Sequence, residues 1–323
     1  MRVVLRRGAG FSPRIGTERR AQSAGVRLRE GCDLHEPVMV AEVLDHLAPS
    51  RGGIFLDCTV GLGGHARALI EAGAAKVIGL DRDMQALDHA RGTLSGSGDA
   101  IELVHADYRA FEDVLNAKGV GQVDGVLADL GVSSLQLDAP GRGFSFRRDE
   151  PLDMRMDTSS GETAADMLAS VEEKALADLI YELGEERHAR RVARAIVAAR
   201  SERRIETTGQ LGDIVRRAVP RKGYARIDPA TRTFQAIRIW VNRELEGLDG
   251  FLMRAAARLA PGGRLVTLTF HSLEDRVVKH TLRALQSAGT VVIRTKRPEV
   301  PLEAEIDRNP RARSAKLRAA ERT

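Results

Sequence analysis

Two strand-end acids and a glycine-rich turn offer the clearest chemistry in this sequence. An apolar run ends at Asp57, and the turn that follows it contains Gly61, Gly63 and Gly64. A second apolar run ends at Asp81, 20 residues after Gly61. Glycines let the backbone approach a ligand at the start of a helix, and an acid at the end of the next strand can bind a ribose. This pattern predicts a site for a nucleoside-containing cofactor.

The spacing leaves the identity of the cofactor open. Gly61, Gly63 and Ala66 also fit the dinucleotide fingerprint, whose last glycine can be alanine. Asp57 would repel a pyrophosphate at the strand end, whereas it would attract the sulfonium and the amino group of S-adenosylmethionine. An ordinary glycine turn without a ligand is a third interpretation, and two acids in register count against it.

Four acids each end an apolar run, namely Asp57, Asp81, Asp107 and Asp129. Ligands of open parallel sheets bind outside the carboxyl ends of the strands. We therefore expect these four side chains along one edge of a sheet and in one site. For Asp107, which precedes Tyr108, a helix-capping role is the simpler interpretation.

Apolar runs predict five strands, and helical patterns separate the first four. We place these strands at residues 53–57, 76–81, 101–105, 123–129 and 264–270. A first helix is expected at 37–47, ahead of the first strand. This alternation predicts an α/β fold with a Rossmann-like, doubly wound parallel sheet.

The gap between the fourth and fifth strands is too long for a simple crossover. A crossover needs about a dozen residues plus its loops, so roughly a hundred residues between Asp129 and Leu265 are an insertion. Its apolar stripes have helical spacing, and the motif Ser170-x-x-Glu173 matches a capping box. A helix that begins at Pro229 is expected to be the crossover into the fifth strand.

These boundaries divide the chain into four parts. Residues 1–33 form an Arg-rich extension that reads as disordered, with a transit peptide as the alternative. Residues 34–136 and 229–323 are expected to build the sheet domain. Residues 137–228 are expected to form an inserted helical domain.

Composition limits the class of protein. The chain has 323 residues, 43% of them apolar, and no apolar run long enough to span a bilayer. Cys32 and Cys58 have neither metal-ligand spacing nor a disulfide framework, which favours a reducing cytoplasm and no metal centre. The net charge of +5 lies within residues 1–33, which hold eight Arg and three acids. An RNA footprint must therefore come from local clusters.

Two clusters of basic residues stand out. In the first, which starts at Arg187 and ends at residue 226, twelve Lys or Arg outnumber three acids. Arg187, Arg190, Arg191 and Arg194 recur at helical spacing and would share one face. This face is either an RNA footprint or a solvated helix surface. The second cluster is the C-terminal tail, which we expect to be solvated.

Several longer motifs are similar to those of one family. They are Gly63-Gly-His65, Asp129-Leu-Gly-Val-Ser-Ser134, Arg142-Gly-Phe-Ser-Phe146, Pro151 to Asp157, Gly184 to Arg187, Ala230 to Trp240, Phe270 to Arg276 and Asn309 to Ser314. The chain closely resembles the bacterial ribosomal RNA small subunit methyltransferase H family, also called MraW. The resemblance runs from about His35 to the C-terminus.

This resemblance implies a class I S-adenosylmethionine-dependent enzyme that methylates the exocyclic N4 of a cytidine in the decoding region of 16S rRNA. It implies cofactor contacts at Gly63, Gly64, His65, Asp81, Tyr108, Asp129 and Gln136. The transferable role of Tyr108 is to stack on adenine. The strand-end chemistry adds Asp57 and Gly61 to these contacts.

Methyl transfer to a cytosine amino group needs residues that prepare a weak nucleophile. Its lone pair is delocalised into the ring, and acceptors that hold its hydrogens can turn that lone pair toward the methyl carbon. We hypothesise that Asp129 and the backbone carbonyl of Leu130 supply these acceptors. The base must also leave its stack, so Phe144 and Phe146 are candidates to hold it. Packing at the domain junction is the alternative for both.

Other interpretations stay open at this point. His271 and Ser272 end the fifth strand, where His271 could contact RNA and Ser272 could cap a helix. A nicotinamide-dependent oxidoreductase is allowed by the glycine spacing and Asp81, but Asp57 and the helical insertion count against it. A non-catalytic RNA-binding protein is the other alternative. Expected partners are 16S rRNA within the small ribosomal subunit and a second copy in a homodimer, with no membrane.

Overall fold

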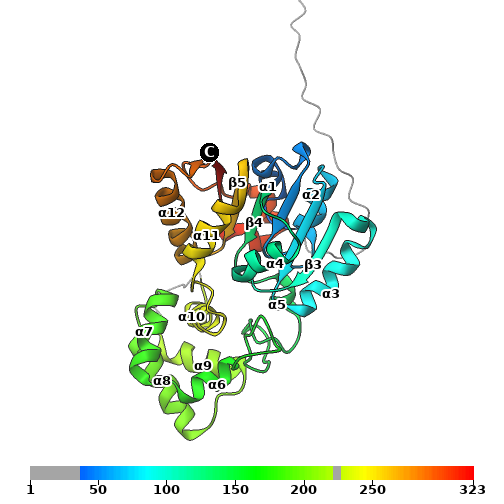
Figure 1. Cartoon of the computed structure of the whole chain (residues 1–323). Coiled ribbons are helices and arrows are strands. Elements are labelled where there is room, and N and C mark those ends of the chain that lie inside the picture. The colour runs from blue at the N-terminus through cyan, green and yellow to red at the C-terminus, as the bar shows by residue number, and fades with distance from the viewer. Residues whose placement is uncertain (1–36, 221–226) are drawn as a thin grey trace, which may run out of the picture. The chain divides into compact units, whose positions relative to one another are not determined.

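One sheet of seven strands organises the computed structural model, which describes residues 37–220 and 227–323 (Figure 1). The strand order is β3-β2-β1-β4-β5-β7-β6. The strands are β1 (Ile54–Asp57), β2 (Lys76–Asp81), β3 (Ile101–His105), β4 (Val123–Asp129), β5 (Leu259–Thr269), β6 (Val291–Ile293) and β7 (Lys316–Arg322). Strands β1 to β5 run parallel, while β7 runs antiparallel to both of its neighbours.

The parallel part confirms the predicted doubly wound sheet. The first four predicted strands agree with the structure to within one residue, whereas β5 begins earlier, at Leu259. The register pairs Asp57 with Leu127 and Asp129 with Leu268. The carboxyl ends of the parallel strands therefore meet at one edge, and the four predicted acids lie at or just beyond it.

Helices cover both faces of this sheet over two hydrophobic layers. One layer includes side chains from α1 (Val40–Leu47), α2 (Gly64–Glu71) and α3 (Met84–Thr93). The other includes side chains from α4 (Phe111–Ala117), α11 (Leu248–Arg258) and α12 (Ser272–Ser287). Shorter elements are η1 (Pro49–Arg51), η2 (Ser95–Ala100), η3 (Tyr108–Ala110), α13 (Glu303–Arg308) and η4 (Pro310–Ser314).

The C-terminal residues are not the solvated tail that the sequence suggested. Strand β7 lies between β5 and β6, and the side chains of Leu317 and Ala319 are fully buried. Arg318 is buried as well, because its Nε donates a 2.6 Å hydrogen bond to Asp275 Oδ1 on α12. The prediction was wrong because charged residues flank the buried apolar ones in this strand, and those charges pair with distant residues, Arg318 with Asp275 of α12 and Glu321 with Arg264 of β5.

A third hydrophobic core holds the insertion between β4 and β5. Its helices are α6 (Ala164–Ser170), α7 (Glu173–Gly184), α8 (Ala189–Glu202), α9 (Thr208–Ala218) and α10 (Ala230–Asn242), after the short α5 (Ser134–Asp138). Among the described residues between β4 and β5, the only β-pairing is an isolated bridge between Pro151 and Thr207. The predicted helical character of this segment is confirmed.

The capping box predicted at Ser170 is wrong. Ser170 is the last residue of α6, and α7 begins after Glu172 without a side-chain cap. Capping boxes instead start α6 at Thr163 and α9 at Thr207, where each threonine accepts from a backbone N–H three residues later. Threonine followed by an acid or glutamine is the same signal as the one sought at Ser170.

The predicted crossover helix also needs correction. Helix α10 ends at Asn242, and α11 is the helix that leads into β5. Phe234 and Ile237 of α10 are buried in the core of the insertion.

The division at residue 228 remains a prediction, and residues 35–323 form one compact unit. The predicted extension 1–33 and His35 lie outside the described residues. No described helix is long and apolar enough to cross a membrane.

Candidate active site

A cavity of about 400 Å³ lies at the carboxyl ends of the parallel strands. Its lining includes several residues predicted from the sequence, namely Gly61, Gly64, His65, Asp81, Tyr108, Asp129, Leu130, Gln136 and His271. Residues from α10, α12 and η4 close its other sides. The structure thus brings together groups that are more than two hundred positions apart in the sequence.

The glycine turn leaves β1 with two residues in the left-handed region. Gly61 has a φ of 53° and Gly63 a φ of 86°, which side chains rarely adopt. Gly61 N donates a 2.8 Å hydrogen bond to Asp81 Oδ2. A Cβ on Gly63 would lie 2.9 Å from Leu94 Cδ1, so this glycine lets α2 pack closely against α3. Gly63 supports the turn without lining the cavity.

Asp81 connects the turn to the end of β2. Its Oδ2 accepts from Gly61 N, and its Oδ1 accepts from Asp83 N at 2.8 Å. Burial raises the pKa of this carboxyl to about 6, although both backbone hydrogen bonds oppose the rise. An acid fixed in this way at the end of β2 has the position expected for a ribose contact.

Asp57 lies behind the cavity wall and not in it. Its side chain is 1% exposed, its Oδ1 accepts from Thr59 N at 3.1 Å, and its Oδ2 is buried without a hydrogen-bond partner. Burial, with the nearby charge of Asp81, raises its pKa to about 7. Asp57 does not line the cavity, so the structure does not place it where the predicted direct contact with the cofactor would form.

Asp129 is the acid that faces the cavity at the centre of the edge. About 24% of its side chain is exposed, yet its Oδ1 is buried without a hydrogen-bond partner. Its Oδ2 lies 3.7 Å from His65 Nδ1, and its backbone N–H donates to Thr59 Oγ1 at 2.7 Å. Burial and the charges of Asp57 and Glu274 raise its pKa to about 8. With a pKa of about 8, this carboxyl binds or releases a proton near neutral pH.

His65 and Leu130 complete the surroundings of Asp129. His65 is buried, and its Nε2 lies 2.9 Å from the carbonyl oxygen of Val38. Leu130 lines the cavity directly after Asp129, and its backbone N–H donates to the carbonyl of Leu268 in β5. These contacts fix the backbone from which both predicted catalytic groups project.

Asp107 and Tyr108, which follow β3, have different roles. Asp107 caps η3, accepts from Arg109 N at 2.9 Å and pairs with Arg82 at 3.3 Å, so the helix-cap interpretation holds for it. Tyr108 lines the cavity, and its ring meets Phe251 edge to face at 4.7 Å. Burial raises the pKa of its hydroxyl well above the usual value, which keeps Tyr108 neutral.

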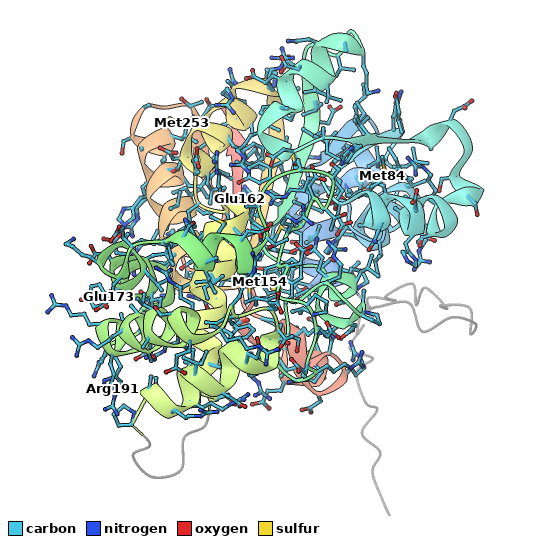
Figure 2. All side chains as sticks on the ribbon, turned by 90° about the horizontal axis from the view of Figure 1, so that it is seen from below. Met84, Met154, Glu162, Glu173, Arg191 and Met253 are labelled. Carbon is cyan, nitrogen blue, oxygen red and sulfur yellow. The ribbon has the colours of Figure 1, made fainter. Side chains whose placement is uncertain are left out.

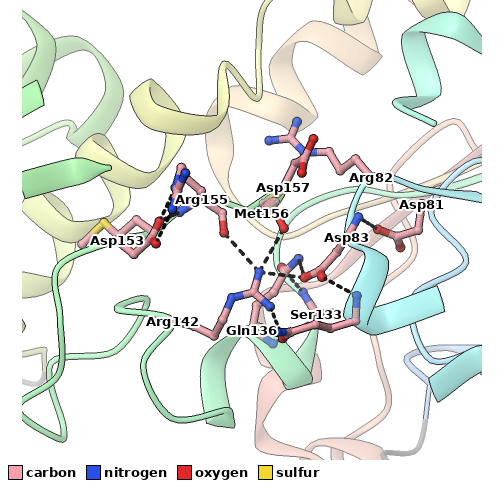
Figure 3. A network of polar contacts seen from close by, with 12 residues as sticks. Asp81, Arg82, Asp83, Ser133, Gln136, Arg142, Asp153, Arg155, Met156 and Asp157 are labelled. Atoms are coloured by element: carbon pink, nitrogen blue, oxygen red, sulfur yellow. Dashed lines mark hydrogen bonds and ion pairs between the residues drawn. The ribbon is translucent and has the colours of Figure 1, made fainter. Parts of the chain in front are cut away.

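A buried polar network holds Gln136 in place (Figure 3). Gln136 accepts from Ser133 N at 2.9 Å and donates to Asp83 Oδ2 at 3.0 Å. Arg142 donates to the same oxygen at 2.8 Å and to the carbonyls of Arg155 and Met156. The loop that enters the insertion is thereby fastened to the residue that caps α3.

The cavity has a second polar wall that the sequence only partly indicated. It is formed by Arg238, Glu244, His271 and Glu274. Of these, only His271 was predicted as a site residue. His271 also caps α12, the role that the sequence suggested for Ser272, whose hydroxyl instead donates to Glu185 at 2.8 Å. The others were missed because α10, the turn after it and α12 meet only in the folded chain.

Two predicted aromatic residues lie outside the cavity. Phe146 meets Phe234 edge to face at 4.9 Å within the core of the insertion. Phe144 is buried with the guanidinium of Arg142 over its ring at 5.8 Å. Neither ring lines the cavity, and their contacts fit the packing alternative, while a role in holding the base stays a prediction.

The predicted arginine face lies on the outside of the insertion. Arg187, Arg190, Arg191 and Arg194 are exposed at and just before α8, and Figure 2 shows Arg191 pointing away from the helices. Arg194 Nε lies 3.7 Å from Glu173 Oε1, which neutralises part of its charge. The remaining charge is open to solvent and to any acidic partner.

The strand order and the acid-rimmed cavity define a class I S-adenosylmethionine-dependent methyltransferase fold. The chain belongs to the MraW methylase family, whose profile matches residues 33–323. It is 51% identical over 303 residues to a ribosomal RNA small subunit methyltransferase H of Bradyrhizobium diazoefficiens, covering 90% of this chain and 92% of that protein. A protein of the same name from Deinococcus radiodurans is 52% identical over 290 residues, or 89% of each chain.

Among solved structures, an rRNA methylase of Streptococcus thermophilus is 13% identical, with a TM-score of 0.39, covering 86% of this chain and 94% of that one. The fold assignment rests on the sheet order and the family match. S-adenosylmethionine is therefore the cofactor, and the nicotinamide alternative is set aside. The residues present fit it, because Asp81 and Asp129, whose Oδ1 is buried without a partner, line the cavity beside a turn that Gly61 keeps open.

Proposed function

We propose that this protein transfers the methyl group of S-adenosylmethionine to the exocyclic N4 of a cytidine in the decoding region of 16S rRNA. The most similar relatives above carry the name ribosomal RNA small subunit methyltransferase H, which supports this substrate class. The structural observation that carries the proposal is Asp129, whose Oδ1 is buried and without a partner beside the cavity.

Asp129 would prepare the nucleophile. The cofactor supplies an electrophilic methyl carbon on a sulfonium that is already a good leaving group. The amine is weak because its lone pair is delocalised, so an acceptor that holds one N4–H can rotate that lone pair out of the ring plane. Asp129, together with the backbone carbonyl of Leu130, is proposed to accept these hydrogens and to orient N4 for in-line attack.

The same carboxylate is proposed to take the released proton. When the N4–methyl bond forms and the sulfur–methyl bond breaks, N4 carries an extra proton that must leave. A carboxyl whose pKa is raised to about 8 binds a proton more readily than an ordinary aspartate. The positive charge of the cofactor would favour the ionised form of Asp129 before the reaction, so it could accept afterwards.

The arginine face of α8 is proposed to bind the RNA backbone. Exposed Arg187, Arg190, Arg191 and Arg194 would contact phosphates, and the insertion would position the structured decoding region over the cavity. We propose the assembled small subunit in the cytoplasm as the substrate. A homodimer is proposed as well, and analytical ultracentrifugation of the full chain will test it.

Incubation with labelled S-adenosylmethionine and unmodified small subunits tests the function directly. We expect label at one cytidine, found by nuclease mapping, and much less on naked 16S rRNA. Asp129→Ala should abolish methylation while calorimetry still detects cofactor binding. Retained methylation with normal cofactor affinity would exclude a catalytic role for Asp129, and absence of label from ribosomal RNA in the unaltered protein would reject the function itself.

A further inference from the structure

His271, which directly follows β5 and Phe270, has one ring nitrogen, Nε2, that makes no well-aligned hydrogen bond. Its Nδ1 accepts the backbone N–H of Glu274 at 3.4 Å and so caps α12. In a neutral imidazole the nitrogen that accepts carries no hydrogen, so the hydrogen is on Nε2. The capping contact therefore sets the tautomer and makes Nε2 a donor.

This donor is buried beside the cavity. The side chain of His271 is 7% exposed, and Nε2 has no partner in hydrogen-bond geometry. Glu274 Oε1 lies 3.1 Å away but off the N–H direction, and the other oxygen of Glu274 accepts from Phe270 N at 3.0 Å. The Glu274 carboxylate stabilises this donor electrostatically without a well-aligned hydrogen bond, so a ligand acceptor in line with Nε2–H would complete its hydrogen bonding.

A metal ion does not explain the cluster. Ligand atoms of Glu244, His271 and Glu274 lie within 4.8 Å of one another, which resembles a cation site. However, both oxygens of Glu244 accept from Arg238, at 2.8 and 2.7 Å. The guanidinium already supplies the positive charge and occupies the carboxylate that a metal would need.

Two buried polar atoms without well-aligned hydrogen bonds thus belong to residues that line one cavity at adjacent strand ends. Asp129 Oδ1 follows β4, and His271 Nε2 follows β5, which pairs with β4 up to Asp129 and Leu268. One is an acceptor when ionised and the other is a donor. The edge of cytosine presents the complementary order, because its N4 amine donates and its ring N3 accepts. Uracil presents the reverse order at the same two positions.

We propose that His271 Nε2–H donates a hydrogen bond to ring N3 of the target cytosine while Asp129 holds its amine. This inference rests on the proposed function and names the residue that selects the base. Glu274 orients the His271 ring, because its backbone N–H donates to Nδ1 at 3.4 Å and its carboxylate oxygen lies 3.1 Å from Nε2. A site that hydrogen-bonds its substrate in this way rejects a base that leaves the donor unpaired.

Two substitutions separate base recognition from helix capping. The side-chain amide of His271→Asn can replace Nδ1 and keep the cap, but nothing replaces Nε2. The amide of His271→Gln reaches the Nε2 position and loses the cap. If His271 recognises the base, His271→Asn should lower kcat/KM for small subunits about ten- to a hundredfold, and His271→Gln should retain more activity. A purely structural role predicts the opposite order, with the larger loss of thermal stability in Gln.

A substrate lacking the acceptor provides the decisive measurement. Small subunits reconstituted with 3-deazacytidine at the target position keep the amine and lose ring N3. The unaltered protein should methylate them about ten- to a hundredfold more slowly, whereas His271→Asn should show no further loss. His280→Asn, an exposed histidine on the same helix, is the matched control and should behave as the unaltered protein.

The outcomes are distinct. Equal rates of the unaltered protein on cytidine and 3-deazacytidine, or losses that multiply in His271→Asn, overturn the role of His271 and leave the methyltransferase function intact. If His271→Asn does not fold, the comparison of the two substrates with the unaltered protein still decides. Absence of methylation on cytidine itself would instead reject the proposed function. Cofactor affinity should be the same in all variants.

Discussion

Arg142 Nη2 and Asp83 Oδ2 form a 2.8 Å ion pair, and both side chains are at least 95% buried (Figure 3). The pair joins the loop that leads into the insertion to the cap of α3, two residues after Asp81. Through the carbonyls of Arg155 and Met156, Arg142 also fixes a loop that borders the cavity. These contacts therefore fix the first loop of the insertion to the end of the sheet that borders the cavity.

Removing the cation of this pair should be costly. Arg142→Met leaves the carboxylate of Asp83 buried with only neutral donors, so we expect a loss of about 3–5 kcal/mol in the free energy of unfolding. Denaturant titration followed by circular dichroism measures it. The control is Arg91→Met, which breaks an exposed pair with Asp88 on α3 and should change stability by about 1 kcal/mol or less. Equal effects would show that the buried pair has no special weight.

The raised pKa values predict a pH-dependent preference for the charged cofactor. The carboxyls of Asp81, Asp57 and Asp129 have pKa values of about 6, 7 and 8, so the empty site holds protons near neutral pH. A cationic ligand favours their ionised forms, and binding should release protons. Affinity for S-adenosylmethionine should therefore rise between pH 6 and pH 9, by at most about tenfold per unit for each group.

S-adenosylhomocysteine is the matched ligand for that measurement, because it lacks the sulfonium charge. Its affinity should rise much less over the same range. Calorimetry in buffers of different ionisation enthalpy counts the protons released with each ligand. Parallel pH dependences for the two ligands would contradict an electrostatic role for these acids.

Asp57 should tune Asp129 without touching the ligands. After burial, the charge of Asp57 is the next cause of the raised pKa of Asp129, so Asp57→Asn should lower that pKa. The acidic limb of the pH profile of kcat/KM should then move to lower pH, since Asp129 ionises earlier. The asparagine oxygen can still accept from Thr59 N, so the fold should be retained. Asp99→Asn, at an exposed position, should leave the profile unmoved.

Neutralising the arginine face should weaken RNA binding in a salt-dependent way. Changing Arg190, Arg191 and Arg194 together to Gln removes up to three phosphate contacts, so the slope of log K against log salt should flatten by about one to three units. Filter binding across a salt series measures the slope. The control triple of Arg51, Arg91 and Arg283, all exposed on other elements, should leave the slope unchanged. An unaltered slope in the α8 triple would assign that face to solvent.

The sheet was predictable because its signals are local. Each parallel strand contains an apolar run, and three of the five end in an acid, Asp57, Asp81 or Asp129, at the edge where ligands bind. Strand β7 was not predictable in this way, because Arg318 is buried only by virtue of Asp275, which lies 43 positions earlier. When the burial of a residue depends on a distant partner, the sequence around that residue does not reveal the burial.

The same distinction holds for the site. The glycine turn and its acids lie within one contiguous stretch, so their spacing could be interpreted. The wall formed by Arg238, Glu244 and Glu274 depends on how α10 and α12 pack, and no spacing rule relates them. Phe144 and Phe146 show the complementary case. They are close to Asp129 in the sequence, but the folded chain does not place them in the cavity.

The position of β7 between β5 and β6 has a consequence for biogenesis. Strand β6 is synthesised before β7 but pairs with β7 and not with β5. While the nascent chain is still emerging, the outer edge of β5 therefore has open backbone groups, which is the state most prone to aggregation. A chain truncated between these strands would therefore lack the partner of both β5 and β6 and leave the sheet unfinished.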